Sequence, residues 1–348
     1  MYDIFGSRAN IEEKHWERCM DRRTLLKSAA GAAAFGVMQA PAVHAQGAWP
    51  VPGRTVKVIV PWPPGAANDA LGRLLAQKLQ EKFGASTVVE NRTGGAGLIG
   101  TNAVIQSEPD GYTLLASAFN TAVMPMVIKG ATFDPEVDLD FVARTAVAPL
   151  VGIMTAQRPE KDLAAMIAAA KANPKEWLFA ISSLGSAGHL ATIDFARRTG
   201  VRFDLVPYRG TTPALTDIMS GNVQLLIDPA FALLPTAKDG TRARALGIAS
   251  KTRSTLAPEL PTFAEQGLPG FEFNSWYGVW APKGTPRDIC DKINALMQET
   301  MRDPAVVSRL TTQLLEPVAE SSADAKNFIA SEITRARELL KSVNFEPA

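Results

Sequence analysis

The sequence contains little cysteine and histidine, with two cysteines and three histidines among 348 residues. Beyond residue 45 only Cys290 and His189 remain, so that part of the chain cannot form an internal disulfide bond. One cysteine and one histidine cannot build an ordinary zinc or copper site, and no acidic cluster has the spacing of a calcium-binding loop. We therefore expect no metal and no cofactor, and a fold held by the packing of a chain that is 46% hydrophobic.

The chain also lacks an excess of charge of either sign. Its first 45 residues hold six of the 36 lysines and arginines and five of the 35 aspartates and glutamates, which leaves 30 charges of each sign. A neutral chain without a basic tract has no electrostatic footprint for nucleic acid or for an anionic membrane surface. We expect neither of these as a partner.

The N-terminal segment predicts an export signal. Arg22 and Arg23 stand ahead of an Ala- and Gly-rich stretch, residues 28–37, and Val43-His44-Ala45 offers small residues at the −3 and −1 positions of a cleavage site. This order is typical of a twin-arginine signal, which exports a folded protein to the periplasm. The apolar stretch is too short to span a bilayer. We expect cleavage near Ala45 and a true start at Met20, with a surface helix or a transit peptide as the alternatives.

Strand-like and helix-like patterns alternate along most of the remaining chain. Strands are predicted at residues 55–60, 87–90, 113–116, 178–181, 204–206 and 223–227. Helices are predicted at residues 68–83, 98–106, 190–199 and 213–220. Residues 286–340 are expected to be nearly all helical, with breaks at Asp303-Pro304 and Glu316-Pro317. This alternation predicts an α/β fold in which parallel sheets are covered by helices.

Two loops of small residues, 61–69 and 182–189, each follow a predicted strand and open a helix. In α/β folds a ligand binds where such loops and helix N-termini converge. Small side chains leave the backbone N–H groups uncovered, and Asn68 or Asp69 can cap the first helix. A helix N-terminus of this kind can hold an anion without lysine or arginine. Either loop, taken alone, is equally well explained as a tight connector.

Motifs along the chain beyond residue 45 occur in a characteristic order. They are Pro63-Pro64-Gly65 with Asp69, Val89-Glu90-Asn91-Arg92 before the glycine run 94–100, Pro109 to Leu114, Pro207-Tyr208-Arg209-Gly210, Pro261-Thr262 with Glu265 and Gly267, and Trp276-Tyr277-Gly278 with Ala281-Pro282. In these motifs the chain resembles the Bug family, the receptors of tripartite tricarboxylate transporters. Ala66 stands where that family usually has a second glycine.

The resemblance implies a fold, a ligand class and a partner. The fold would be the two-lobe clamshell of type II periplasmic binding proteins, each lobe a mostly parallel sheet flanked by helices. The ligand would be a small organic acid held by backbone amides. The protein would deliver it to the membrane permease subunits of a tripartite transporter, as a monomer and without catalysis.

By the same resemblance, the chain crosses between the two lobes twice. The crossings are expected near residues 146–152 and 273–279. After an N-terminal extension and signal of residues 1–45, residues 46–148 with 275–348 would form lobe 1, and residues 149–274 would form lobe 2. The two small-residue loops then lie on opposite lobes, so that only a closed form brings both to one ligand.

Candidate ligand-binding residues lie in the two loops and at neighbouring strand ends. They are Trp62, Gly65, Ala66, Ala67, Asn68, Asp69, Ser117, Phe119, Asn120, Ser182, Ser183, Gly185, Ser186, Ala187, His189, Tyr208, Asp228 and Trp276. Asp228 follows a strand and is suited to a ligand hydroxyl, amine or amide. His189 is expected to satisfy backbone groups at a helix start more than to contact the ligand.

The aromatic candidates have two interpretations. Trp62 and Phe119 can stack on a flat ligand or serve as hydrophobic cover for the hinge. Alternation along a strand places Trp276 and Trp280 on one face. We expect Trp280 in the core, whereas Trp276 either lines the cleft or packs beside it.

Two motifs leave enzymes open as alternatives. Residues 95–100 have the GxGxxG spacing of a dinucleotide-binding loop, but the next predicted strand ends without the acid that would hold a ribose. Around Ser186 the sequence departs by one place from the nucleophile elbow of hydrolases, and His189 follows on the same turn, whereas triad partners normally come from distant segments. A Ser-dependent hydrolase and an NAD(P)-binding oxidoreductase are therefore the alternatives to a binding protein.

Overall fold

The computed structural model describes residues 49–348. These residues form one compact unit. The predicted twin arginine and the cleavage site near Ala45 lie outside the described residues. Within residues 49–348, each helix is either too short or too polar to cross a lipid bilayer.

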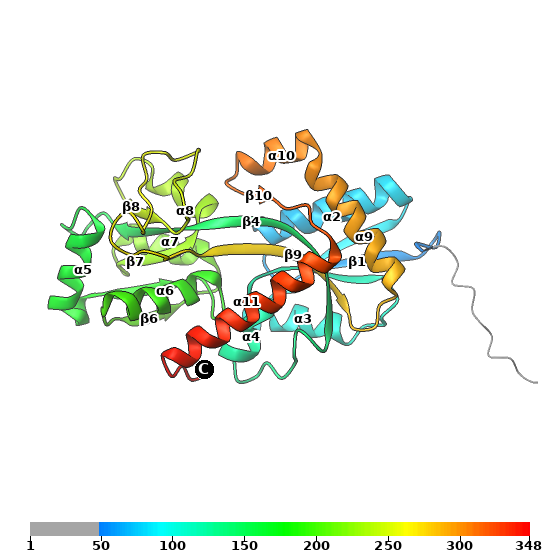
Figure 1. Ribbon diagram of the computed structural model, residues 1–348, viewed down its shortest axis with the longest axis horizontal. Helices are drawn as coiled ribbons and strands as arrows, with labels where there is room; N and C mark the ends of the chain where they lie inside the picture. Colours follow the sequence, from blue (N-terminus) through cyan, green and yellow to red (C-terminus); the bar gives the residue numbers. More distant parts are fainter. Residues whose placement is uncertain (1–48) are drawn as a thin grey trace, which may run out of the picture. The chain divides into compact units, whose positions relative to one another are not determined.

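One part of the β-sheet is built from the first βα units (Figure 1). β1 (Thr55–Val60) lies between its parallel partners β2 (Ser86–Asn91) and β3 (Thr113–Ala118), and β3 pairs antiparallel with β9 (Asn274–Pro282). The helices that follow are α2 (Ala67–Phe83), α3 (Leu98–Ile105) after the short turn η1 (Gly95–Gly97), and α4 (Asn120–Val127). α2 ends at Gly84, whose φ of 65° favours glycine. The predicted elements of this part are confirmed within two residues.

The other part repeats this plan with residues from the middle of the chain. β5 (Leu178–Ile181) lies between its parallel partners β6 (Asp204–Pro207) and β7 (Leu225–Pro229). Its helices are α5 (Leu163–Ala172), followed by the turn η2 (Pro174–Glu176), then α6 (Ala187–Thr199), α7 (Thr211–Ser220) and α8 (Ala230–Ala237). β8 (Ala243–Ile248) pairs antiparallel with β4 (Leu139–Thr155).

β4 belongs to both parts of the sheet. It pairs with β9 as far as Pro149 and with β7 and β8 from Leu150 onward, antiparallel in each case. The sheet is therefore mixed: the βα units on either side pair in parallel as predicted, and β4 and β9 add antiparallel pairs at its centre. The sequence pattern missed β4 because its second half is buried on both faces and shows no alternation of apolar and polar residues.

Two helices begin earlier than predicted. α6 begins at Ala187 rather than at residue 190, because the Oγ of Ser186 accepts the N–H of His189 at 3.0 Å and caps the helix. α7 begins at Thr211 rather than at residue 213, since proline is tolerated throughout the first helical turn.

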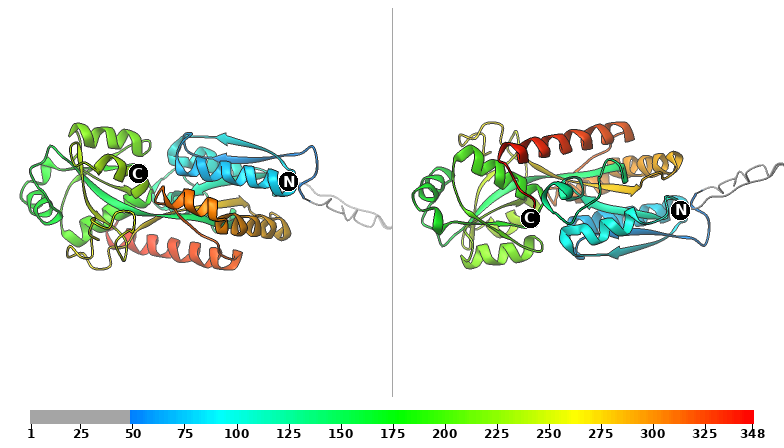
Figure 2. Two further views of the ribbon diagram at one scale, coloured as in Figure 1. Left: turned by 90° about the horizontal axis from the view of Figure 1, so that it is seen from above. Right: turned by 90° about the horizontal axis from the view of Figure 1, so that it is seen from below.

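The C-terminal residues form three helices, with the breaks where the prolines predict them. α9 (Arg287–Arg302) ends before Asp303, whose side chain accepts the N–H of Ala305 and caps α10 (Pro304–Thr311). The short β10 (Glu316–Pro317) pairs with β4 and precedes α11 (Ser322–Ser342). α11 extends along β4 and reaches α4 and α6 (Figures 1 and 2).

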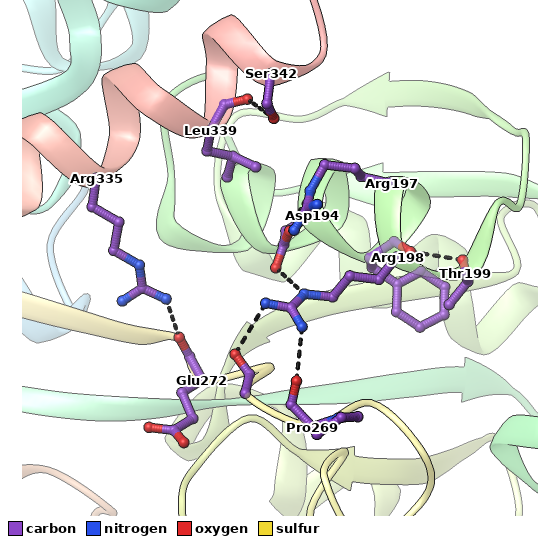
Figure 3. A network of polar contacts seen from close by, with 11 residues as sticks. Asp194, Arg197, Arg198, Thr199, Pro269, Glu272, Arg335, Leu339 and Ser342 are labelled. Atoms are coloured by element: carbon purple, nitrogen blue, oxygen red, sulfur yellow. Dashed lines mark hydrogen bonds and ion pairs between the residues drawn. The ribbon is translucent and has the colours of Figure 1, made fainter.

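Polar contacts attach the segment before β9 to α6 and α11 (Figure 3). Arg198 of α6 is held by Asp194 and donates to the carbonyl oxygen of Pro269 at 2.8 Å. Arg335 of α11 donates to the carbonyl oxygen of Glu272. These arginines satisfy backbone carbonyls that have no strand partner, and they fix where the chain enters β9.

Candidate functional site

A cavity of about 390 Å³ lies where helices from both parts of the sheet begin. The residues that line it are Trp62, Pro63, Gly65, Ala66, Ala67, Asn68, Ala118, Asn120, Ser182, Ser183, Ser186, Ala187, Arg209, Gly210, Thr211, Thr212, Pro213, Leu215, Asp228, Pro229, Phe231, Ala232, Ser275 and Tyr277. They include the N-terminal residues of α2, α4, α6, α7 and α8. Because a helix N-terminus carries partial positive charge, the cavity is suited to an anion.

The N-terminus of α2 presents uncapped backbone N–H groups. The residue before the helix, Ala66, makes no side-chain hydrogen bond, and the first N–H groups of a helix have no acceptor within it. The N–H of Ala66 lies 3.5 Å from the carbonyl oxygen of Pro63, so the free donors begin at Ala67. The predicted cap by Asn68 or Asp69 is wrong.

Asp69 fixes the loop instead. Its carboxylate accepts hydrogen bonds from the N–H of Gly65 at 3.0 Å, from Arg73 at 3.0 Å and from Asn91 at 2.9 Å. Burial opposes ionisation of Asp69, but these hydrogen bonds and the charge of Arg73 lower its pKa overall. Asp69 is therefore a charged anchor for the loop, and it lies outside the cavity lining because its side chain turns back toward Gly65.

Asn68 carries a donor without a partner. The residue lines the cavity, is 7% exposed, and its Nδ2 has no hydrogen-bond acceptor in the described part of the chain. Leaving a buried amide unsatisfied costs about 1–3 kcal/mol. Asn68 thus offers a hydrogen-bond donor to an acceptor that enters the cavity.

The β5–α6 loop is held by His189, which is fully buried. Its Nδ1 accepts the N–H of Gly185 at 3.1 Å, which confirms the predicted bonding at the helix start. Burial lowers the pKa of His189 to about 4, so the ring is neutral at pH 7. The ring packs against Phe345, and the Oγ of Ser186 contacts the backbone N–H of His189 rather than its ring. This arrangement lacks the bond between nucleophile and base that a Ser–His hydrolase needs.

Gly188 allows α6 to approach β7 closely. A Cβ at this position would lie 2.1 Å from the carbonyl oxygen of Ile227 and 3.0 Å from Oδ1 of Asp228. A side chain here would push the helix away from the strand, and with it the wall formed by Ser182, Ser186 and Ala187.

Asp228 is the buried carboxylate of the cavity, at 1% exposure. Its Oδ1 accepts the hydroxyl of Ser182 at 2.9 Å, and its Oδ2 accepts the hydroxyl of Thr211. Burial raises the pKa of Asp228 to about 6, although both hydrogen bonds lower it. At pH 7 the group is largely ionised, and it becomes protonated in mild acid.

The start of β9 lines the cavity, but Trp276, the candidate that the sequence offered there, does not. Ser275 and Tyr277 line it, whereas Trp276 is fully buried on the opposite face and donates to Glu332 at 3.2 Å. Trp276 and Trp280 do share a face, with ring centroids 6.3 Å apart. Alternation therefore identified which residues share a face but not which face meets the cavity.

Other predicted residues support the walls without lining the cavity. Ser117 accepts the hydroxyl of Thr121 at 2.8 Å, and Phe119 packs edge-on against Trp276. Gly185, Asp69 and His189 hold the loops as described above. The hydroxyl of Tyr208 donates to Asp217 at 2.6 Å.

Tyr208 instead lines a neighbouring hollow of about 490 Å³, together with the glycine run 94–97. Trp62, Pro63, Ser183 and Arg209 line both spaces.

Sequence reasoning missed the walls that α7 and α8 supply. They are formed by residues 209–213 and 215 and by residues 229, 231 and 232. Two hydroxyl residues before a proline, Thr211-Thr212-Pro213, are a common helix-start signal and could have shown that α7, predicted from residue 213, begins at Thr211 beside the cavity. Pro229 lies immediately before α8, directly after Asp228.

Comparison with known proteins gives a consistent result. The family model described as "tripartite tricarboxylate transporter family receptor" matches residues 71–345. Protein BugT of Bordetella pertussis is 39% identical over 290 residues, which are 82% of this chain and 87% of BugT.

Two solved structures are also similar. Rpa4515 of R. palustris, solved with adipate, is 33% identical with a TM-score of 0.80, and the match covers 85% of this chain and 99% of that one. The periplasmic binding protein BugD is 28% identical with a TM-score of 0.77, over 86% of this chain and 100% of BugD.

Proposed function

Because the chain belongs to the receptor family of the tripartite tricarboxylate transporters, we propose that it captures a small carboxylate in the cavity and delivers it to the membrane permease of such a transporter. Its fold is the two-lobe clamshell of periplasmic binding proteins. The residues that we assign to the ligand are those predicted positions that line the cavity: Trp62, Gly65, Ala66, Ala67, Asn68, Asn120, Ser182, Ser183, Ser186, Ala187 and Asp228.

The observation that carries this proposal is the set of uncapped donors at the start of α2. At the start of α2, the backbone N–H groups from Ala67 onward and the Nδ2 of Asn68 have no side-chain acceptor. These donors border the same cavity as the start of α6. A carboxylate accepts several such bonds at once. The adipate bound to the related Rpa4515 supports this ligand class.

Closure of two lobes would bring the donors together. We assign residues 46–148 with 275–348 to lobe 1 and residues 149–274 to lobe 2. The change of partner strand in β4 between Pro149 and Leu150 supports the first boundary, and the start of β9 at Asn274 supports the second. α2 then belongs to lobe 1 and α6 to lobe 2, so that opening separates the donors and releases the ligand.

The same proposal covers location and chemistry. We propose that the protein is exported through its twin-arginine signal and works as a monomer. Its relation to the periplasmic binding protein BugD supports the proposed location in the periplasm. We also propose that the ligand leaves unchanged. The neutral, buried His189, whose ring does not contact Ser186, supports binding without catalysis.

The test removes one donor from α2 without changing charge. Ala67→Pro deletes the N–H of the first helical residue, a position where proline is favoured, and Ala66 before it already has the extended backbone that proline requires, with φ −73° and ψ 162°. Losing one hydrogen bond to a carboxylate costs about 1.5–3 kcal/mol, or about 10- to 150-fold in affinity. Titration calorimetry with adipate, and with a panel of other organic acids, measures this loss.

Two controls isolate the donor. Ala67→Gly keeps the N–H and is expected to bind within a few-fold of the parent. Ser322→Pro places proline at the equivalent position of α11, after Ser321 with φ −68° and ψ 158°, and should leave affinity unchanged. Folded Ala67→Pro protein that binds acids as tightly as the parent would show that the carboxylate is held elsewhere.

A further inference from the structure

The Asp228 end of the cavity is built to accept hydrogen bonds. The hydroxyls of Ser182 and Thr211 both donate to the carboxylate, one to each oxygen. A hydroxyl has one hydrogen, so each of these groups has only lone pairs left to offer a ligand. Asp228 itself retains further lone pairs, because each carboxylate oxygen accepts more than one hydrogen bond. This cluster, Asp228 with Ser182 and Thr211, is called the acceptor cluster below.

Positive charge does not neutralise the acceptor cluster in the described structure. The side-chain partners of Asp228 among residues 49–348 are the two neutral hydroxyls. The other titratable residues that line the cavity are Arg209, which is exposed, and Tyr277. Burial and the nearby negative charge of Asp228 raise the pKa of Tyr277, so its hydroxyl is neutral at pH 7.

The elements packed against Asp228 contribute uncharged groups. β4 places Val151 beside it, α6 places Gly188 beside it, and α7 supplies Thr211. α8 contributes Phe231 and Ala232 to the cavity next to it. An anionic group placed at the acceptor cluster would therefore meet an ionised carboxylate without a cation between them, which costs several kcal/mol in a buried site.

The donors come from the other part of the sheet. α2, which follows β1, supplies its free N–H groups and the unpartnered Nδ2 of Asn68, whereas the acceptor cluster lies at the ends of β5 and β7 and the start of α7. One cavity thus offers donors from one side and acceptors from the other. Its ligand needs complementary groups at two separate points.

We propose that the ligand is a carboxylic acid that also carries a hydroxyl or amino group, with the carboxylate bound at α2 and the hydroxyl or amino group donating to the acceptor cluster. The inference rests on the proposed function, because it assigns the carboxylate to the same cavity. It adds that an acid without such a donor is discriminated against by Asp228. The acceptor cluster therefore determines specificity, whereas the helix N-termini provide the common affinity for an anion.

The experiment compares acids that differ by one substituent. On carbon skeletons of three to six atoms, each unsubstituted acid is paired with its hydroxy and its amino derivative, for example succinate with malate and aspartate. Affinities are measured by titration calorimetry at pH 7.5 with the full-length mature protein and with Asp228→Asn. A hydrogen bond to a charged group gives about a 10-fold preference or more for the substituted acid in the parent protein. In Asp228→Asn we expect that preference to fall below about 3-fold.

Repeating the titrations at pH 5 adds a second reading. Burial raises the pKa of Asp228 to about 6, so at pH 5 the parent carries a protonated acid that can itself donate to a second carboxylate. The preference should therefore decrease in the parent but not in Asp228→Asn. The acids titrate in this range too, and the variant in the same buffers is the reference for that effect.

Thr211→Val provides an independent variant of nearly the same shape. It removes one hydroxyl that lowers the pKa of Asp228, so the pH at which the preference disappears should move upward. Equal affinity for both members of every pair, in parent and variants alike, overturns the acceptor cluster while leaving the proposed function intact. Failure of every acid to bind the parent overturns the proposed function as well.

Discussion

The ligand-free protein should become more stable at neutral pH when Asp228 is replaced by asparagine. Burial raises the pKa of this carboxyl from 3.8 to about 6 in the folded state. A folded pKa above the unfolded one means that the native state binds the proton more tightly. Stability from this group is therefore fully present below pH 3.8 and is lost as the pH rises through about 6.

The magnitude follows from the shift. About two pKa units correspond to about 3 kcal/mol of unfolding free energy, which the parent loses between acid and neutral pH. Asparagine has the shape of the protonated acid, and the hydroxyls of Ser182 and Thr211 can rotate to bond its amide. Asp228→Asn should thus match the parent at pH 4 and exceed it by up to about 3 kcal/mol at pH 8.

Urea unfolding followed by tryptophan fluorescence measures this difference at pH 4, 6 and 8. The pH profile of the parent alone does not suffice, because His189 contributes over the same range. Burial lowers its pKa to about 4, so its contribution to the free energy of unfolding decreases as the pH falls. Subtracting parent from variant removes the His189 contribution. Asp217→Asn is the control, since hydrogen bonds from Tyr208 and Asn222 lower the pKa of that carboxyl and no gain at pH 8 is expected. A difference for Asp228→Asn that stays constant from pH 4 to 8 would refute the reasoning.

Two further predictions concern packing and export. Gly188→Ala places a Cβ 2.1 Å from the carbonyl oxygen of Ile227 and should lower the free energy of unfolding by at least about 1–3 kcal/mol, as measured by urea unfolding. The control is Gly130→Ala, whose Cβ meets nothing within 4 Å. Its free energy of unfolding should stay within about 0.5 kcal/mol of that of the parent. Arg22→Lys with Arg23→Lys should leave the precursor in the cytoplasm in cell fractionation, because the arginine pair is recognised by its geometry as well as its charge; normal export of this double variant would contradict the twin-arginine signal.

The βα units could be predicted from sequence because their signals are local. A β-branched run ending in a proline-rich turn identified β1, and small residues before an amphipathic helix identified the start of α2 within one residue and that of α6 within three. These signals placed two walls of the cavity correctly. The position of Asp228 beside them also followed, since strand ends at one edge of a parallel sheet lie together.

What the sequence left open depends on contacts between distant segments. Alternation of side chains along β9 put Trp276 and Trp280 on one face of the strand. Phe141 and α11 pack against that face, so that Ser275 and Tyr277, on the other face, meet the cavity. Likewise, Asp69 has the sequence position of a helix cap. Arg73 and Asn91 draw its carboxylate to the loop instead, and the helix remains open to a ligand.

The strand order determines when the chain can fold during synthesis. In the sheet, β9 lies between β3 and β4, and Leu115 of β3 pairs with Trp280 of β9. When the ribosome has completed β4, both neighbours of β9 have been made but β9 has not. The facing edges of β3 and β4 therefore remain unpaired until residue 282 has left the exit tunnel. Completion of this part of the sheet therefore waits for residues 274–282, and until then the facing edges of β3 and β4 can pair with other strands. The twin-arginine export that we propose would suit such a chain, because it would postpone transport until β9 is in place.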